Sequence, residues 1–210
     1  MSLGRVRAVA IAAVLVVTVA ACAGPVLSPA PSATTPASSA SSPGASTASP
    51  EPSSSAGPAI VVDEGLLDIL PPQVDGIDLV SDPVTAASIA SDPDLAPIAS
   101  AIAVALAIEP GASVGDDLAV VSVVQLRPGS YDDTWFRSWR DTYDEAACEP
   151  AGGAVGNAQA RIAGHDTFIG TCARGAFTYH VHLEDPDRLV SITSVGEQRL
   201  GEQVVAGLGE

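Results

Sequence analysis

The chain contains no lysine, so all nine of its basic residues are arginines, and they stand against 25 aspartates and glutamates. The formal net charge is −16 at pH 7, and no acidic residue precedes Glu51. The negative charge therefore belongs to the part of the chain from Glu51 onward. A surface this acidic repels nucleic-acid phosphates and anionic lipid head groups. The composition excludes a nucleic-acid partner.

The longest apolar run is Ala8–Ala21, which is interrupted only by Thr18 and follows Arg5 and Arg7. A helix that spans a bilayer needs about 20 apolar residues, and this run has 14. A short basic region before an apolar core of this length is typical of a secretory signal peptide. We expect residues 1–21 to be removed on export, which leaves seven arginines against 25 acids and a formal charge of −18.

The apolar run ends in Val19-Ala20-Ala21-Cys22, which resembles the lipobox of bacterial lipoproteins. The resemblance covers the N-terminal segment alone. It implies that Cys22 becomes the first residue of the mature chain and carries a diacylglyceryl group and palmitate. Two acyl chains are enough for stable anchoring, so the resemblance implies a protein on the extracytoplasmic face of the cell membrane. The alternative is an ordinary secretory signal followed by a chance cysteine. The lysine-free composition, rich in alanine and arginine, indicates a high-GC bacterium of the actinobacterial kind.

Three cysteines are an uneven number for an exported protein. If Cys22 carries lipid, Cys148 and Cys172 remain as a single pair, and an oxidising compartment favours a disulfide between them. Closing that loop should stabilise the fold by about 3 kcal/mol. The alternative is two free, buried thiols.

The segment Ser28–Pro58 consists of serine, proline, alanine, threonine and glycine, with Glu51 as the one exception. Such a segment has no side chains with which to build a core, and we expect it to be disordered. It indicates a stalk that holds a domain away from a membrane. The predicted organisation is a lipoprotein signal peptide (1–21), a lipidated cysteine with a disordered linker (22–58) and one domain (59–210).

Helix signals occur at four places in the predicted domain. The tripeptides Ser81-Asp82-Pro83 and Ser91-Asp92-Pro93 each combine a capping aspartate with a proline at the first helical position. The second predicted helix runs to about Ile108, with Ile98, Ile102 and Leu106 on one face, and ends at Glu109-Pro110-Gly111. Two more helices are expected over Tyr131 to about Ala147, with Ser130 and Asp133 as its capping pair, and from about Glu197, with Leu200, Val204 and Leu208 four residues apart.

Strand signals follow a different period. The run Leu118–Leu126 is β-branched and almost wholly apolar, as in a strand buried on both faces. After Gly152-Gly153, turn signals separate four further predicted strands, at about 157–163, 166–172, 175–184 and 188–195. The expected fold class is α+β, with a mostly antiparallel sheet of about five strands packed with helices and one disulfide.

The predicted helix over Tyr131–Ala147 carries Trp135, Phe136, Trp139 and Tyr143 at spacings of three and four residues. We interpret this stripe as the buried face of the helix. A platform on which carbohydrate rings stack is the alternative.

Gly111-Ala112-Ser113-Val114-Gly115 matches G-x-S-x-G, the nucleophile elbow of serine hydrolases. That mechanism needs a strand before the turn and a helix after it. Here the predicted helix comes first and the predicted strand follows, so we interpret Ser113 as part of a loop.

The stretch TYHVHLED, residues 178–185, holds two of the three histidines. Residues two apart on a strand share a face, so His180 and His182 lie together with Glu184, opposite the apolar set Phe177, Tyr179, Val181 and Leu183. We expect the histidine face to be solvated. The alternatives are polar packing under a helix and a metal site, in which Glu184, Asp185, His165 or Asp166 would complete the ligands.

The acid pairs Asp116-Asp117 and Asp92-x-Asp94 lack the spacing of an EF-hand loop. The sequence also holds no phosphate-binding loop, nucleotide fingerprint or CxxC motif. We expect a non-enzymatic, lipid-anchored protein of the cell envelope that needs no cofactor and binds an envelope protein or a small ligand. One alternative is a metal-binding protein or metal-dependent enzyme that uses His180 and His182. The other is a carrier of a small ligand or lipid.

Overall fold

The computed structural model of the chain describes residues 59–109, 111–112 and 116–209. The predicted signal peptide, Cys22 and linker lie outside these residues, as does Ser113 of the G-x-S-x-G motif. In chain order the elements are β1 (Val61–Val62), η1 (Glu64–Ile69), β2 (Gln73–Val74), β3 (Ile77–Ser81), α1 (Pro83–Ala90), β4 (Ala99–Ile108), β5 (Leu118–Leu126), α2 (Asp133–Cys148), η2 (Glu149–Ala151), β6 (Ala154–Ile162), β7 (His165–Cys172), β8 (Ala176–Leu183), β9 (Arg188–Val195) and α3 (Leu200–Ala206).

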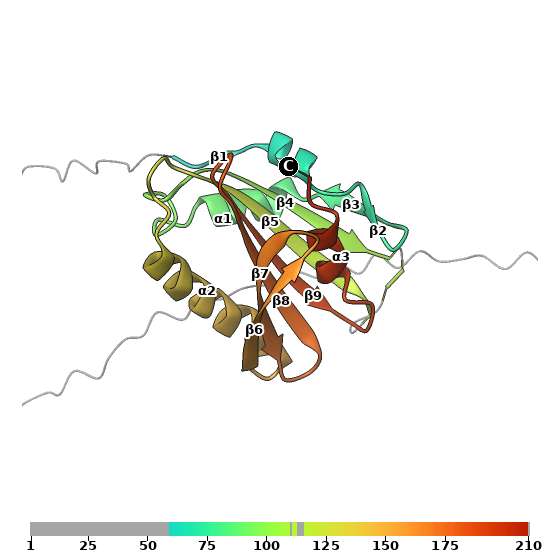
Figure 1. Cartoon of the computed structure of the whole chain (residues 1–210). Helices are drawn as coiled ribbons and strands as arrows, with labels where there is room; N and C mark the ends of the chain where they lie inside the picture. The colour runs from blue at the N-terminus through green and yellow to red at the C-terminus, as the bar shows by residue number, and fades with distance from the viewer. Residues whose placement is uncertain (1–58, 110, 113–115, 210) are drawn as a thin grey trace, which may run out of the picture. The chain divides into compact units, whose positions relative to one another are not determined.

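The strands form one sheet in the order β2-β3-β4-β5-β9-β8-β7-β6, with β1 pairing β4 in parallel (Figure 1). All other pairings are antiparallel. The mostly antiparallel α+β fold is therefore confirmed, but the expected size of the sheet is wrong. It has nine strands rather than about five, because β1 to β4 were not foreseen.

Helices cover both faces of this sheet. On one face, α3 and η1 pack against a core that includes Val121, Tyr179 and Ile192. On the other face, α1 and α2 pack against a second cluster around Ile102 and Phe136. The period of two residues along each strand sends alternate side chains to these two layers.

The helix expected from Ser91-Asp92-Pro93 to Ile108 is wrong, because β4 occupies most of that range. Pro97 removes a backbone donor inside the expected helix and disfavours helical backbone at the residue before it. The spacing of Ile98, Ile102 and Leu106 was read as helical, but residues four apart also share one face of a strand. The carboxylate of Asp92 accepts a hydrogen bond from the backbone of Asp94 at 2.9 Å in a turn.

The other three expected helices are present, although the capping pair expected for α2 is wrong. Helix α1 begins at Pro83, and the carboxylate of Asp82 accepts hydrogen bonds from the backbone N–H of Thr85 at 3.1 Å and from its hydroxyl at 2.6 Å. These bonds hold the pKa of Asp82 below its ordinary value. Helix α2 is capped by Asp132 rather than by Ser130. The aromatic stripe faces the sheet as expected, but only Phe136 is fully buried, and Trp135 and Trp139 are partly buried against the same cluster.

The five expected strands are all present, and the Leu118–Leu126 strand has the expected bounds. The disulfide between Cys148 and Cys172 is also confirmed. It joins the last residue of α2 to the last residue of β7. The C-terminal end of α2 is thereby fixed to the sheet.

Candidate functional site

Polar side chains form two rows across the sheet beneath α2. In the first row, Ser122 of β5 lies beside Ser191 of β9, which lies beside His180 of β8. In the second row, Thr193 of β9 pairs with Thr178 of β8. These residues project to the same side of the sheet because each strand alternates with a period of two. The face beneath α2 therefore carries more hydrogen-bonding side chains than the face beneath α3.

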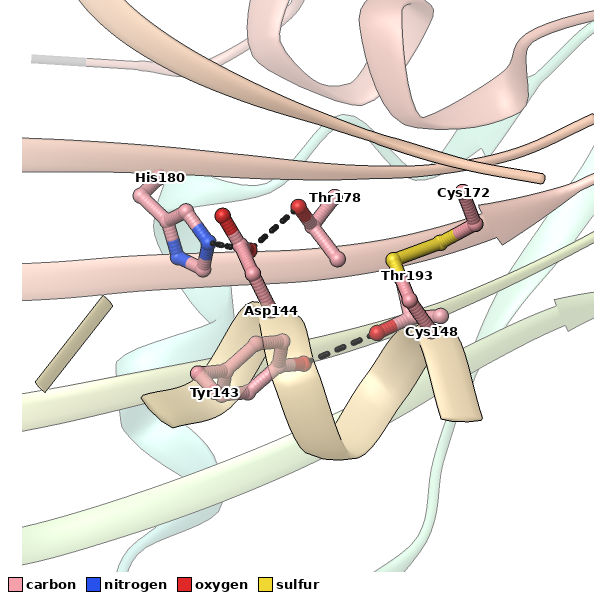
Figure 2. Close-up of a disulfide and its surroundings, with 7 residues drawn as sticks. All are labelled: Tyr143, Asp144, Cys148, Cys172, Thr178, His180 and Thr193. Atoms are coloured by element: carbon pink, nitrogen blue, oxygen red, sulfur yellow. Dashed lines mark hydrogen bonds and ion pairs between the residues drawn. A yellow bond between two sulfur atoms is a disulfide. The ribbon is translucent and has the colours of Figure 1, made fainter. Parts of the chain in front are cut away.

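Asp144 of α2 reaches down into these rows. Its Oδ1 accepts a hydrogen bond from the hydroxyl of Thr178 at 2.5 Å, and it lies 2.8 Å from Nε2 of His180 (Figure 2). Asp144 is 7% exposed and His180 is fully buried. A buried carboxylate needs compensation of this kind, because an unpaired charge away from water is costly.

The backbone of β7 leaves room for this carboxylate. An added Cβ at Gly170 would lie 2.7 Å from Oδ2 of Asp144 and 2.2 Å from the hydroxyl oxygen of Thr178. Both distances are shorter than any real Cβ contact. Glycine at position 170 is therefore a requirement of the Asp144 contacts.

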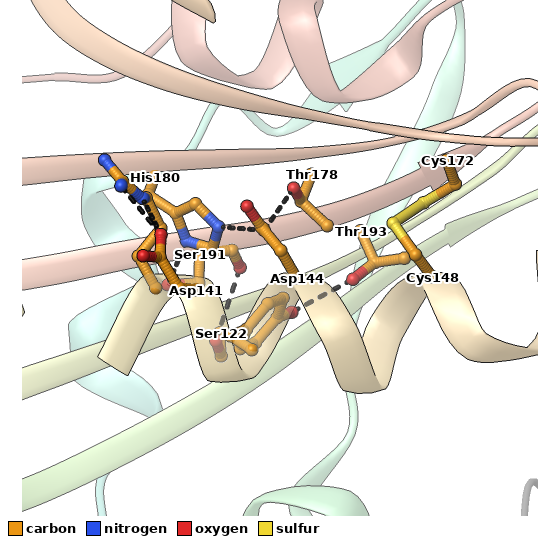
Figure 3. Close-up of polar contacts among 11 residues, drawn as sticks. Ser122, Asp141, Asp144, Cys148, Cys172, Thr178, His180, Ser191 and Thr193 are labelled. Atoms are coloured by element: carbon orange, nitrogen blue, oxygen red, sulfur yellow. Dashed lines mark hydrogen bonds and ion pairs between the residues drawn. A yellow bond between two sulfur atoms is a disulfide. The ribbon is translucent and has the colours of Figure 1, made fainter. Parts of the chain in front are cut away.

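His180 is bonded at both ring nitrogens. Its Nδ1 lies 3.3 Å from the hydroxyl oxygen of Ser191, and the carbonyl of Ser191 in turn accepts from the hydroxyl of Ser122 at 3.3 Å (Figure 3). In the neutral ring, donation from Nε2 to Asp144 leaves Nδ1 as the acceptor of the Ser191 hydroxyl. Trp139 and Tyr143 enclose the ring edge-on, with ring centroids 5.4 and 5.0 Å away.

Tyr143 makes the next contact along the helix. Its hydroxyl lies 3.0 Å from the hydroxyl of Thr193 (Figure 2). Burial and the neighbouring Asp144 raise the pKa of Tyr143, while the hydrogen bond with Thr193 acts in the opposite direction. The phenol thus remains protonated and available for this bond well above neutral pH.

The expectation that His180 and His182 lie on a solvated face is wrong. They do share one side of β8, as the alternation predicted, but α2 covers that side. His180 is completely buried, and the side chain of His182 is 15% exposed. The alternative of polar packing under a helix describes His180. The reason is that α2 carries its own polar partner, Asp144, to this face of the sheet.

His182 belongs to a separate cluster at the end of β8. Its Nε2 lies 2.7 Å from a carboxylate oxygen of Asp187, and its ring stacks on Tyr131 with centroids 3.6 Å apart. Burial, the hydrogen bond to Asp133 and the charges of nearby acids together raise the pKa of Tyr131 to about 12. Each histidine of the pair therefore has an aspartate of its own.

The bonding of each histidine to its own aspartate bears on the alternative prediction of a metal site at His180 and His182. Bonding to two different aspartates at Nε2 directs the rings of His180 and His182 to separate partners. His182 lines a pocket of about 450 Å³ together with the other weak candidates, His165, Asp166, Glu184 and Asp185. Within the described ranges, however, no group of three or more histidine, cysteine, aspartate and glutamate residues is arranged to hold a metal ion.

The order Ser191, His180, Asp144 is that of a serine-hydrolase triad. Hydrolysis requires that a substrate carbonyl reach the serine oxygen. Ser191 is 1% exposed and His180 is fully buried, with α2 lying over them. The array is a structural network in which hydroxyl, imidazole and carboxylate groups satisfy one another beneath a helix.

A pocket of about 150 Å³ lies beside this network, at the junction of α2 with β6 and β7. The guanidinium of Arg140 lies over the ring of Phe168, 4.8 Å from its centroid, and is bonded to Asp141 at 2.7 Å. The pocket is lined by Arg140, Asp144, Asn157, Ala158, Gln159, Phe168 and Ile169. Of the network residues, Asp144 lines this pocket.

One aspartate from each of the acid pairs considered for calcium makes a hydrogen bond within the fold. Asp117 accepts a hydrogen bond from the backbone of Gln198 at 2.8 Å, which ties the start of β5 to the segment before α3. Asp92 shapes the turn before β4.

Sequence reasoning missed Asp144, which makes the central contacts of the network. A signal was present, because Asp144 lies eight residues after Phe136 and four before Cys148, on the helical face that both of them bury.

No helix in the described part of the chain is both long and apolar enough to cross a membrane. Comparisons with models of known families, with characterised proteins and with solved structures found no match for this chain.

Proposed function

We propose that this protein is a lipid-anchored module on the extracytoplasmic face of a bacterial cell membrane, whose α+β domain binds another component of the envelope and performs no catalysis. The observation that carries the proposal is the pairing of Cys148 with Cys172. The chain has three cysteines, so this pairing leaves Cys22 as the remaining one. Cys22 stands in the lipobox-like sequence, where a thiol is needed for acylation.

The disulfide also supports an extracytoplasmic location. Disulfides persist in oxidising surroundings and are rare in the cytosol. Cys148 is fully buried and Cys172 is 2% exposed, so the bond belongs to the core rather than to a reactive surface. A lasting structural disulfide of this kind fits an exported protein.

The closed polar network does not favour a catalytic role for the groups within it. The groups best suited to acid, base or nucleophilic chemistry, Asp144, His180 and Ser191, are bonded to one another beneath α2. The core between α3 and the sheet is filled by Leu200, Val204 and Tyr179. Neither arrangement favours the metal-dependent enzyme or the lipid carrier over the binding module.

Membrane fractionation tests the anchor. The full chain is expressed in a bacterial host that processes lipoproteins, alongside Cys22→Ser. We expect wild type in the membrane fraction, resistant to salt extraction, and the variant in the soluble extracytoplasmic fraction. The matched control is the double variant Cys148→Ala with Cys172→Ala, which lacks the disulfide but keeps Cys22 and should remain on the membrane. Membrane association of a Cys22→Ser chain from which residues 1–21 have been removed would contradict the proposal.

A further inference from the structure

The polar rows beneath α2 continue past the Asp144 network into the pocket of about 150 Å³. In the second row, Thr178 of β8 pairs with Gly170 of β7, and Gly170 pairs with Asn157 of β6. Residues opposite each other in antiparallel strands share one face of the sheet, so Asn157 lies on the α2 side. Gln159 lies two residues further along β6 and shares that face. The pocket is therefore the end of a row of hydrogen-bonding groups.

One carboxylate oxygen of Asp144 is directed to this end of the row. Its Oδ1 makes the contacts with Thr178 and His180, whereas its Oδ2 has no hydrogen-bond partner among the described residues (Figure 2). Oδ2 lies above the backbone of β7, because a Cβ added at Gly170 would stand 2.7 Å from it. Asp144 is 7% exposed and lines the pocket. A carboxylate oxygen with so little contact with water favours a hydrogen-bond donor in the pocket.

Arg140 brings the opposite charge to the same pocket. It precedes Asp144 by one helical turn, and its guanidinium lies over the ring of Phe168. Within the described part of the chain, Arg140 forms its ion pair with Asp141 and not with Asp144. That pair uses Nε and Nη2 of the guanidinium, which leaves Nη1 to donate to another acceptor. The pocket thus holds a cationic and an anionic group that are not bonded to each other.

We infer that this pocket binds a small zwitterion, an α-amino acid with a short side chain. The ammonium group of the ligand donates to Oδ2 of Asp144, and its carboxylate accepts from Arg140. The amides of Asn157 and Gln159 line the same pocket and accept the remaining N–H groups. Charge selects this ligand, because a simple cation would face Arg140 and a simple anion would face Asp144. A ligand with both charges meets a partner at each end.

The size of the pocket restricts the ligand further. Pockets that hold drug-sized molecules measure roughly 300–1,000 Å³, whereas this one measures about 150 Å³. Phe168 contributes an apolar wall, and its ring already lies beneath the Arg140 guanidinium. The ligand therefore has a side chain about as short as that of alanine. The inference goes beyond the proposed anchor and envelope partner and rests on neither, since the pocket belongs to the domain.

Proton–nitrogen correlation NMR of the predicted mature chain, residues 22–210 with Cys22→Ser, tests the site with L-alanine as the probe. We expect saturable shifts of the backbone amide signals of Asp144, Asn157 and Gly170. The dissociation constant should be on the order of 1 mM, which is within the affinity that so small a ligand can supply. N-acetylalanine lacks the ammonium group and alanine amide lacks the carboxylate, so each should bind at least about tenfold more weakly.

Substitutions test the two charged groups separately. Arg140→Gln removes the charge but keeps a polar side chain, and should weaken L-alanine binding about tenfold. Asp144→Asn should do the same, since its amide oxygen still accepts from Thr178 but the charge is lost. The matched control is Arg161→Gln, which removes the same charge from a β6 side chain that is 70% exposed and lies outside the pocket lining. It should bind like the parent chain, and circular dichroism should show that all variants are folded.

The ligand series decides the inference on the parent chain, without dependence on the folding of any variant. No saturable shift at tens of millimolar L-alanine overturns it. Equal binding of alanine amide or of N-acetylalanine also overturns it, because the site would then recognise one charge only. Glucose that produces the same shifts at the same concentration contradicts the selection by charge. Equal losses for Arg140→Gln and Arg161→Gln would contradict the placement of the site.

Discussion

Helix α3 meets the sheet through Leu200, Val204 and Val205, all completely buried among apolar side chains. Helix α2 meets the opposite face differently. Its N-terminal half packs aromatic rings, but its C-terminal half is held by Asp144, by Tyr143 and by a disulfide. One face is thus held by apolar packing, and the other by directional bonds between specific atoms.

The difference has a consequence for stability. When a buried apolar side chain is shortened, the free energy of unfolding falls with the number of atoms removed and the size of the cavity left. A polar contact fails in another way, since removing one partner leaves the other buried without a hydrogen bond. We therefore expect substitutions on the α3 face to act independently and those on the α2 face to be coupled.

The largest effect is expected on the apolar face. Leu200→Ala removes a fully buried side chain and should lower the free energy of unfolding by about 3–4 kcal/mol, since α3 cannot collapse into the space. Urea unfolding monitored by tryptophan fluorescence measures this. Val84→Ala, at a residue 79% exposed, is the control and should cost less than about 0.5 kcal/mol. A loss below about 1 kcal/mol for Leu200→Ala would contradict apolar attachment of α3.

The disulfide comes next. Replacing Cys148 and Cys172 together by alanine opens a loop with a sequence separation of 24 and should cost about 3 kcal/mol. Amide hydrogen exchange should then show loss of protection in α2 while α3 keeps its own. Equal loss in both helices would show that the two faces are not fastened independently.

Asp144→Ala should lower the free energy of unfolding by about 2–3 kcal/mol, because Thr178 and His180 are left buried without their acceptor. Asp144→Asn should cost less, since an amide oxygen still accepts from the threonine hydroxyl. The control is Asp141→Ala, whose side chain is 65% exposed; loss of its ion pair with Arg140 should cost about 0.5 kcal/mol or less. Equal effects at the two aspartates would contradict the network.

A smaller effect is expected at Gly170. Gly170→Ala forces Asp144 and Thr178 apart and should cost about 1–2 kcal/mol. Gly156→Ala on β6, where an added Cβ meets nothing within 4 Å, is the matched control and should be nearly neutral. Unfolding midpoints of the two variants decide the point, and identical midpoints would mean that the Asp144 contacts tolerate an added methyl group.

The smallest expected effect at neutral pH is that of tyrosine ionisation on the stability of the fold. Burial raises the pKa of Tyr143 on the α2 face, and raises that of Tyr179 on the α3 face to about 12. Because both folded-state pKa values exceed the unfolded value of about 10, the stabilisation is complete below pH ~10 and is lost as the pH rises through the folded-state pKa, which for Tyr179 is about 12. Phenolate absorbance should show no tyrosine of the folded protein titrating near pH 10, whereas the denatured chain should titrate there. A folded-state transition near pH 10 would contradict the burial of these rings.

Much of the C-terminal half could be predicted from the sequence. Strands β6 to β9 alternate with a period of two between clear turn signals, and α2 and α3 carry buried stripes at helical spacing. Strand β4 could not be assigned in this way, because residues four apart share a face in both helix and strand. The short strands β1 and β2 have two residues each, too few to show any period.

The site was predicted only in part. Alternation placed His180 and His182 on one side of β8, and that is confirmed by the register of β8 with β9. What covers that side depends on contacts between segments distant in sequence, since Asp144 and His180 are 36 residues apart. A single sequence shows no such pairing, and the buried acid on α2 was therefore missed.

The most direct test of the polar attachment is a double-mutant cycle between Asp144 and His180. The free energy of unfolding is measured for Asp144→Ala, His180→Ala and the combined variant. If the two side chains stabilise α2 through one shared contact, the combined loss should be smaller than the sum of the single losses by about 1–2 kcal/mol. Additivity within about 0.5 kcal/mol would contradict the coupled network beneath the helix.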